Sequence, residues 1–153
     1  MAVFKAVIHT DVFLDHLLGR QEPSVLRQAL QKFFCYTTVF QAVDLFSMGR
    51  SARELQVISD AMAAMKVLGL NAKNARRYGE FVRQRGSKNR WNSMIAGLCL
   101  ESRLPIITGQ GKEFRGIPGL TIIPSHLIVE RKTADEIHRT LQPTGQVNRV
   151  FAG

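Results

Sequence analysis

The sequence is poor in cysteine, in acidic residues and in long apolar runs, and each shortage excludes a class of protein. Only two cysteines, Cys35 and Cys99, occur in 153 residues, and each lies among apolar neighbours without a nearby Cys or His. We therefore expect buried free thiols instead of a disulfide framework or a cysteine-based metal site. No apolar run approaches the roughly 18 residues of a membrane-spanning helix, so we expect no membrane association. The amino terminus, MAVFKAVIH, is typical of a strand and not of a signal peptide, which predicts a cytoplasmic protein.

What the chain does contain is enough apolar material for one globular domain. Apolar residues make up 45% of the sequence, a fraction typical of folded proteins. At this length a single core is expected, with no linker and no internal repeat. We assign residues 1–142 to one domain and expect residues 143–153 to form a loose tail.

The positive charge is concentrated in one segment. Lysine and arginine total 21 against 12 acidic residues, for a net charge of +9. Residues 71–90 hold seven basic residues and a single acidic one, Glu80. A patch of this kind is expected where a protein binds a polyanion, most often RNA or DNA. A solvated helix face, or one covered by an acidic partner protein, is the alternative. The candidate nucleic-acid contacts are Arg76, Arg77, Arg83, Arg85, Lys88 and Arg90.

Short apolar runs alternate with amphipathic segments along the whole chain. Five runs rich in β-branched residues predict strands at 3–8, 35–38, 66–70, 104–108 and 117–124. Helical spacing and capping residues predict helices at 11–18, 25–34, 39–48, 52–65, 72–84, 91–100 and 134–141, with caps at Ser24, Ser51, Asn71 and Thr133. This alternation predicts an α/β fold, a three-layer sandwich with a parallel sheet of about five strands flanked by helices.

Polar residues stand at two informative places. His9, Thr10 and Asp11 follow the first strand directly, where open α/β sheets bind ligands. The simpler alternative is that Thr10 or Asp11 caps the next helix, and from this stretch alone that alternative is favoured. Asp44 is a carboxylate in an otherwise apolar helix, and charged groups are rarely buried without a partner. It either belongs to a site, points to solvent or pairs with an arginine.

Two nucleotide-binding motifs are absent. The loop at 109–114, GQGKEF, lacks the first glycine of a P-loop and carries Glu113 in place of its Ser or Thr. No G-x-G-x-x-G turn follows the first strand, which argues against a dinucleotide-binding domain.

Taken together, four stretches resemble the PIN domain, in particular toxin nucleases of the virulence-associated C type. The most specific is the third, an IAG helix followed by a Leu-Pro-Ile-Ile-Thr strand and a Lys-Glu-Phe end. The stretches, in chain order, are VIHTDVFLDHLL, TTVFQAVDLFSMGR, RWNSMIAGLCLESRLPIITGQGKEF and IPGLTII.

The resemblance implies a metal-dependent ribonuclease that cleaves single-stranded RNA, as the toxin of a toxin–antitoxin pair. Clustered acidic residues would hold one or two Mg²⁺ or Mn²⁺ ions, which prefer oxygen ligands and activate water in phosphodiester cleavage. An antitoxin partner and a homodimer are implied in the same way. Carried over to this sequence, the catalytic candidates are His9, Asp11, Asp44 and Asn92, and the metal-ligand candidates are Asp11, Asp44 and Glu113.

The sequence departs from the family pattern at several acidic positions. The family's first aspartate is His9 here, and the aspartate expected before the IAG helix is Asn92. The loop position that often carries Asp or Asn is Gln110. The helix acid is kept as Asp44, one methylene shorter than the usual glutamate, and Glu113 fits the final acidic position.

Two hypotheses follow from these departures. In the first, the site still binds metal, with His9 adding an imidazole that suits Mn²⁺ or Zn²⁺ better than Mg²⁺. In the second, the site has lost its metal and the fold serves as a module that binds RNA or a partner protein. Because His9 and Asn92 lower the local negative charge, the residues slightly favour reduced or absent cleavage.

Overall fold

A computed structural model of the chain describes residues 3–86, 89–130, 132–141 and 150–151. Its centre is one five-stranded sheet in the order β3-β2-β1-β4-β5, with every neighbouring pair parallel. The strands are β1 Lys5–Ile8, β2 Phe34–Thr38, β3 Lys66–Leu68, β4 Ile106–Thr108 and β5 Ile122–Pro124. Parallel neighbours need crossover connections, which the intervening helices supply. The predicted α/β fold with about five parallel strands is confirmed.

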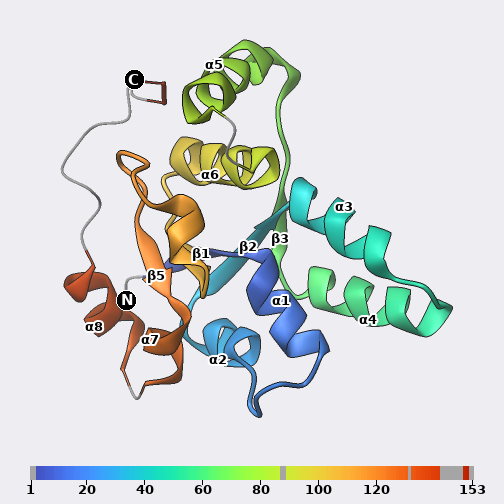
Figure 1. Cartoon of the computed structure of the whole chain (residues 1–153). Coiled ribbons are helices and arrows are strands. Elements are labelled where there is room, and N and C mark those ends of the chain that lie inside the picture. The colour runs from blue at the N-terminus through green and yellow to red at the C-terminus, as the bar shows by residue number, and fades with distance from the viewer. Residues whose placement is uncertain (1–2, 87–88, 131, 142–149, 152–153) are drawn as a thin grey trace.

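Helices cover both faces of this sheet (Figure 1). The pair α5 and α6 lies on one face, and α1 and α2 lie on the other. The predicted three-layer arrangement is therefore confirmed. The helices are α1 Thr10–Leu17, α2 Val25–Lys32, α3 Val39–Met48, α4 Ala52–Ala63, α5 Ala75–Arg85, α6 Arg90–Ser102, α7 Ser125–Val129 and α8 Ala134–Thr140, with short 3-10 segments η1 Ala72–Asn74 and η2 Gly111–Phe114.

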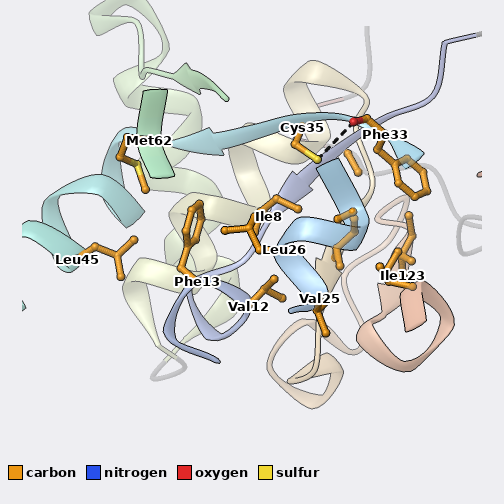
Figure 2. Close-up of a cluster of buried hydrophobic side chains, with 14 of the residues drawn as sticks. Ile8, Val12, Phe13, Val25, Leu26, Phe33, Cys35, Leu45, Met62 and Ile123 are labelled. Carbon is orange, nitrogen blue, oxygen red and sulfur yellow. Dashed lines mark hydrogen bonds between the residues drawn. The ribbon is translucent and has the colours of Figure 1, made fainter. Parts of the chain in front are cut away.

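The central strand β1 contributes side chains to the hydrophobic clusters on both faces of the sheet. Successive side chains of a strand point to opposite faces, so Ala6 and Ile8 enter one hydrophobic cluster and Val7 enters the other. In the first cluster Val12 and Phe13 of α1 lie beside Ile8 (Figure 2). All five of these side chains are almost completely buried. This packing fixes the junction between β1 and α1, which is where His9 lies.

Both cysteines are free and buried, as predicted. The Cys35 thiol donates a weak hydrogen bond to the Phe33 carbonyl at 3.6 Å, drawn as a dashed line in Figure 2. Burial raises the pKa of Cys35 to about 12. Burial raises the pKa of Cys99 as well. Neither thiol forms the thiolate that nucleophilic chemistry requires at neutral pH.

Three of the predicted helix caps are confirmed. The side chains of Ser24, Ser51 and Thr133 each accept a hydrogen bond from the backbone N–H three residues further on. A side-chain oxygen at this position satisfies one of the N–H groups that the first turn leaves free. The predicted cap Asn71 behaves differently, because it caps the 3-10 segment η1 and α5 begins only at Ala75.

The last part of the chain differs most from the prediction. The last strand is only Ile122–Pro124, whereas 117–124 was expected. Gly116 and Gly119 both have φ of 82°, so the backbone turns there instead of extending. The short helix α7 follows directly and was not predicted.

Of the expected tail, residues 143–149 and 152–153 lie outside the described residues. The Phe151 ring lies 5.2 Å from the rings of both Tyr78 and Phe81, so at this residue the chain is packed against α5 and not loose. No helix in the described part of the chain is long and apolar enough to cross a membrane.

Candidate functional site

The polar residues singled out in the sequence meet at the carboxyl edge of the sheet. His9 follows β1 directly, and Thr108 ends the neighbouring strand β4. The first turns of α1, α3 and α6 also reach this edge, where they line a cleft of about 280 Å³. The buried or partly buried polar residues that these turns contribute are Thr10, Asp11, Gln41 and Asn92. In open α/β sheets this is the edge at which ligands bind.

His9 is the centre of a hydrogen-bond network. Its side chain is buried, and the Phe114 ring packs edge-on against it at 4.9 Å. Nε2 lies 3.0 Å from Oδ1 of Asn92. Nδ1 lies 3.0 Å from Oδ1 of Asp11 and 2.9 Å from Oγ1 of Thr108. Both ring nitrogens are therefore engaged with protein groups, and neither is left to coordinate a metal ion.

Both carboxylate oxygens of Asp11 are also engaged. Oδ1 faces His9 and accepts from the Thr108 hydroxyl at 3.1 Å, and Oδ2 accepts from the Gly109 N–H at 2.7 Å. Burial raises the pKa of Asp11, but the imidazole of His9 and the donors of Gly109 and Thr108 outweigh it, so the pKa lies below its ordinary value. Asp11 thus ties α1 to the end of β4. It does not cap α1, whose N-cap is His9 without a side-chain hydrogen bond, so the helix-cap alternative is wrong.

Asn92 extends the network to Glu113. Its backbone N–H is capped by Oδ1 of Asn89 at 3.1 Å, which fixes the first turn of α6. Its Nδ2 donates to Oε2 of Glu113 at 3.4 Å. Arg85, at the end of α5, donates to the Glu113 carbonyl at 2.9 Å. This places the basic helix next to the site.

Two polar residues of α3 that lie one turn apart, Gln41 and Asp44, differ in their exposure to solvent. Asp44 lines the cleft but is exposed, and it makes no ion pair with the described residues. Gln41 is fully buried, and its Nε2 donates to the Ile8 carbonyl. Sequence reasoning missed Gln41. The available signal was its place three residues after Thr38, whose hydroxyl caps α3 at the Gln41 N–H.

The residues at this edge do not fit a divalent cation as they are arranged. Mg²⁺ and Mn²⁺ sites need several free oxygen ligands around one point. Within the ranges that the structure describes, no group of three or more His, Cys, Asp or Glu side chains is placed to hold a metal ion. The oxygens of Asp11 are occupied, and Asp44 and Glu113 lie at exposed positions. The three predicted ligands are not gathered into one cluster.

The candidate nucleic-acid contacts lie along α5 and at the start of α6. Arg76, Arg77 and Arg83 are exposed on α5, and Arg90 is exposed on α6. Arg85 is half-buried between Ser93 and Glu113. Lys88 lies outside the described residues. At 1.5 Å per residue, Arg76 lies about 13 Å along the helix axis from Arg85, so the basic surface extends well beyond the cleft.

Comparisons with solved structures define the fold. DNA-bound VapBC from Salmonella typhimurium matches with a TM-score of 0.66 at 21% identity, over 80% of this chain and 99% of that chain. VapBC-1 from nontypeable Haemophilus influenzae matches with a TM-score of 0.65 at 16% identity, over 80% and 99%. VapBC2 from Rickettsia felis, bound to a promoter DNA fragment, matches with a TM-score of 0.64 at 17% identity, over 78% and 97%. No protein-family model and no curated protein matches the sequence.

These matches cover nearly the whole of each solved chain. Because the sequence identities are low, the matches establish the fold and not the activity. The chain has a PIN-domain fold, an α/β sandwich with its polar site at the carboxyl edge of a parallel sheet. More particularly, this fold is shared with the matched VapBC structures.

Proposed function

We propose that this chain is a toxin-type PIN domain that binds single-stranded RNA and does not hydrolyse it through a divalent ion. The observation that carries the proposal is the engagement of His9 and Asp11 with one another and with Asn92 and Thr108. In the resembled nucleases the corresponding edge presents free carboxylates to metal ions. Here the same edge is closed by hydrogen bonds within the protein.

The distribution of charge supports RNA as the ligand. Exposed arginines run along α5 and reach the site through the contact of Arg85 with Glu113. These exposed guanidinium groups on α5 can attract a phosphodiester backbone without a bridging cation.

A metal-dependent ribonuclease is the second candidate, and the VapC-like fold favours it. Asp11 and Asp44 line the same cleft, and Glu113 reaches it through Asn92. If the chain is a metal-dependent ribonuclease, Mg²⁺ or Mn²⁺ binds only after the hydrogen-bonded carboxylates are released from their present partners. Cleavage would then be weaker than in a site built from free carboxylates.

The proposal also includes protein partners. A toxin–antitoxin complex from Klebsiella pneumoniae has a similar fold, so we propose an antitoxin-like partner for this chain. From the family resemblance we also propose a homodimer and action in the cytoplasm. Light scattering distinguishes the 17.2 kDa monomer from a dimer of the purified chain.

The test is binding and cleavage of one labelled single-stranded RNA in EDTA, in Mg²⁺ and in Mn²⁺. We expect fluorescence anisotropy to show equal binding in all three conditions and gels to show no product. Metal-dependent product that disappears in Asp44→Ala would establish the second candidate. Failure to bind RNA under any condition would overturn both.

A further inference from the structure

Outside the His9 network, the cleft is lined by uncharged amide groups and by aromatic rings. Gln41, Asn89 and Gln110 contribute carboxamides, and Trp91 and Phe40 contribute rings. Asp11 and Asp44 also line the cleft, and their negative charge repels a phosphate group that enters it. The chemistry of the lining therefore suits a neutral, planar, hydrogen-bonding group better than an anion.

The amides retain hydrogen-bonding capacity. Oε1 of Gln41 is buried in the wall of the cleft and accepts no hydrogen bond from the described residues. A buried acceptor without a partner costs free energy, and a donor brought by a ligand removes that cost. The exposed Gln110 side chain makes no hydrogen bond to the described part of the chain either. Gln41 can thus offer an acceptor to a ligand, and Gln110 can offer a donor and an acceptor.

Trp91 supplies the flat surface. It is the single tryptophan of the chain and is the second residue of α6, between Arg90 and Asn92. It is 48% exposed, although its ring also contacts Phe40 at 5.7 Å. Unpaired bases stack on such rings in single-strand binding, whatever their sequence.

We propose that the cleft takes up one unpaired nucleobase of single-stranded RNA, stacked on Trp91 and hydrogen-bonded by the amides of Gln41 and Gln110. A carboxamide presents one donor beside one acceptor, which is the pattern that asparagine and glutamine use against base edges. The volume of about 280 Å³ is at the lower end of ligand pockets and suits one base. Arg90 and Arg85 lie outside the cleft, where the flanking phosphates would pass.

This inference rests on the proposed RNA binding, and one experiment separates the two. Because Trp91 is the single tryptophan, its fluorescence reports only on this cleft. An RNA oligonucleotide is titrated into the full chain in EDTA, with anisotropy of a label on the RNA and tryptophan emission both recorded. The same titration is made with an abasic oligonucleotide of equal length and charge.

We expect the normal RNA to change the Trp91 emission and the abasic strand to leave it unchanged. Gln110→Ala should raise about tenfold the RNA concentration at which half of the emission change is reached, since one good base contact contributes about 1–3 kcal/mol. Gln56→Ala, an exposed glutamine on α4, is the matched control and should change nothing. Anisotropy that rises while emission stays constant would overturn the base site and leave RNA binding intact. Equal emission changes with the abasic strand would overturn it as well. A flat anisotropy signal would instead refute the proposed function.

Discussion

Nε2 of His9 donates to Oδ1 of Asn92 at 3.0 Å, and this bond joins the end of β1 to the first turn of α6. The amide oxygen can only accept, because Nδ2 of Asn92 is turned toward the carboxylate of Glu113. The imidazole therefore carries a proton on Nε2. His9 and Asn92, which stand where the resembled family carries aspartates, are thus hydrogen-bond donor and acceptor for each other.

The first prediction concerns restoration of a metal site by His9→Asp. The introduced carboxylate lies beside Asp11 and cannot donate to Asn92, so the variant should be less stable than the parent in EDTA. Mg²⁺ or Mn²⁺ should raise its melting temperature, since an ion at 100 times its Kd contributes about 2.7 kcal/mol. The parent should show no such rise. Cleavage of single-stranded RNA should appear in His9→Asp, or in the double variant with Asn92→Asp.

The matched control is His126→Asp, which makes the same chemical change at an exposed histidine of α7. It should show no metal-dependent rise in melting temperature. A metal-dependent rise in the parent equal to that of His9→Asp would show that the native site binds the ion as it stands.

The second prediction follows from the lowered pKa of Asp11. The unfolded chain binds the Asp11 proton more readily than the folded chain does. The stabilisation that the ionised Asp11 carboxylate gives the folded chain is therefore fully present above the pKa of about 4 that Asp11 has in the unfolded chain. It is lost as the pH falls through the lower pKa of Asp11 in the folded chain. Asp11→Asn should cost about 1–3 kcal/mol at pH 7 because two donors lose a charged acceptor.

Urea unfolding between pH 7 and pH 3 measures this dependence. The parent should lose more stability over this range than Asp11→Asn does. The other carboxylates titrate in both proteins and cancel in the difference. Parallel curves would show that the hydrogen bonds of Asp11 do not stabilise its ionised form.

The third prediction tests the basic helix as the RNA surface. Arg76→Glu combined with Arg77→Glu should weaken RNA binding and reduce the dependence of log K on log salt by roughly 0.7 for each phosphate that these arginines no longer neutralise. Arg50→Glu with Arg53→Glu is the matched control, because it reverses the same charge at exposed positions around the start of α4. If both double variants lower the affinity and the slope equally, only net charge matters and α5 is not the binding surface.

The sequence predicted the layers of this protein better than its site. Apolar runs that alternate with amphipathic segments predict a parallel sheet, and the five parallel strands and both helical layers agree with that expectation, whereas the strand order comes only from the structure. The last strand was predicted too long because the backbone turns at Gly116, just before the apolar run, and again at Gly119 within it. Apolar content alone does not distinguish a strand from a buried turn.

The site could be located but not assembled from sequence. His9, Asp11 and Asn92 were identified, and the structure brings them together. Asp44 was preferred to Gln41 because a charge among apolar residues attracts attention. The direction of a helical side chain decides burial, however, and Gln41 lies in the first turn beside the sheet edge. Only the fold shows that the neutral residue is inside and the acid is outside.

The last prediction concerns Gly109, where the backbone lies close to the Asp11 carboxylate. A Cβ added at this position would lie 2.9 Å from Oδ2 of Asp11, closer than real Cβ atoms approach. The carboxylate cannot simply move away, because Thr108 and His9 hold its other oxygen. Gly109→Ala should therefore break the 2.7 Å bond between the Gly109 N–H and Asp11 and lower the free energy of unfolding by about 1–3 kcal/mol.

Gly69→Ala provides the comparison, because a Cβ there meets nothing within 4 Å. That variant should be neutral or stabilised by about 0.4–1 kcal/mol through reduced entropy of the unfolded chain. Urea unfolding at pH 7 measures both variants, and the acid dependence described for Asp11 should become shallower in Gly109→Ala alone. Equal stability of the two variants would mean that Asp11 is held by Thr108 and His9 without Gly109. In that case Oδ2 would be free to bind a cation, and the metal-dependent candidate would gain the oxygen ligand that the present arrangement denies it.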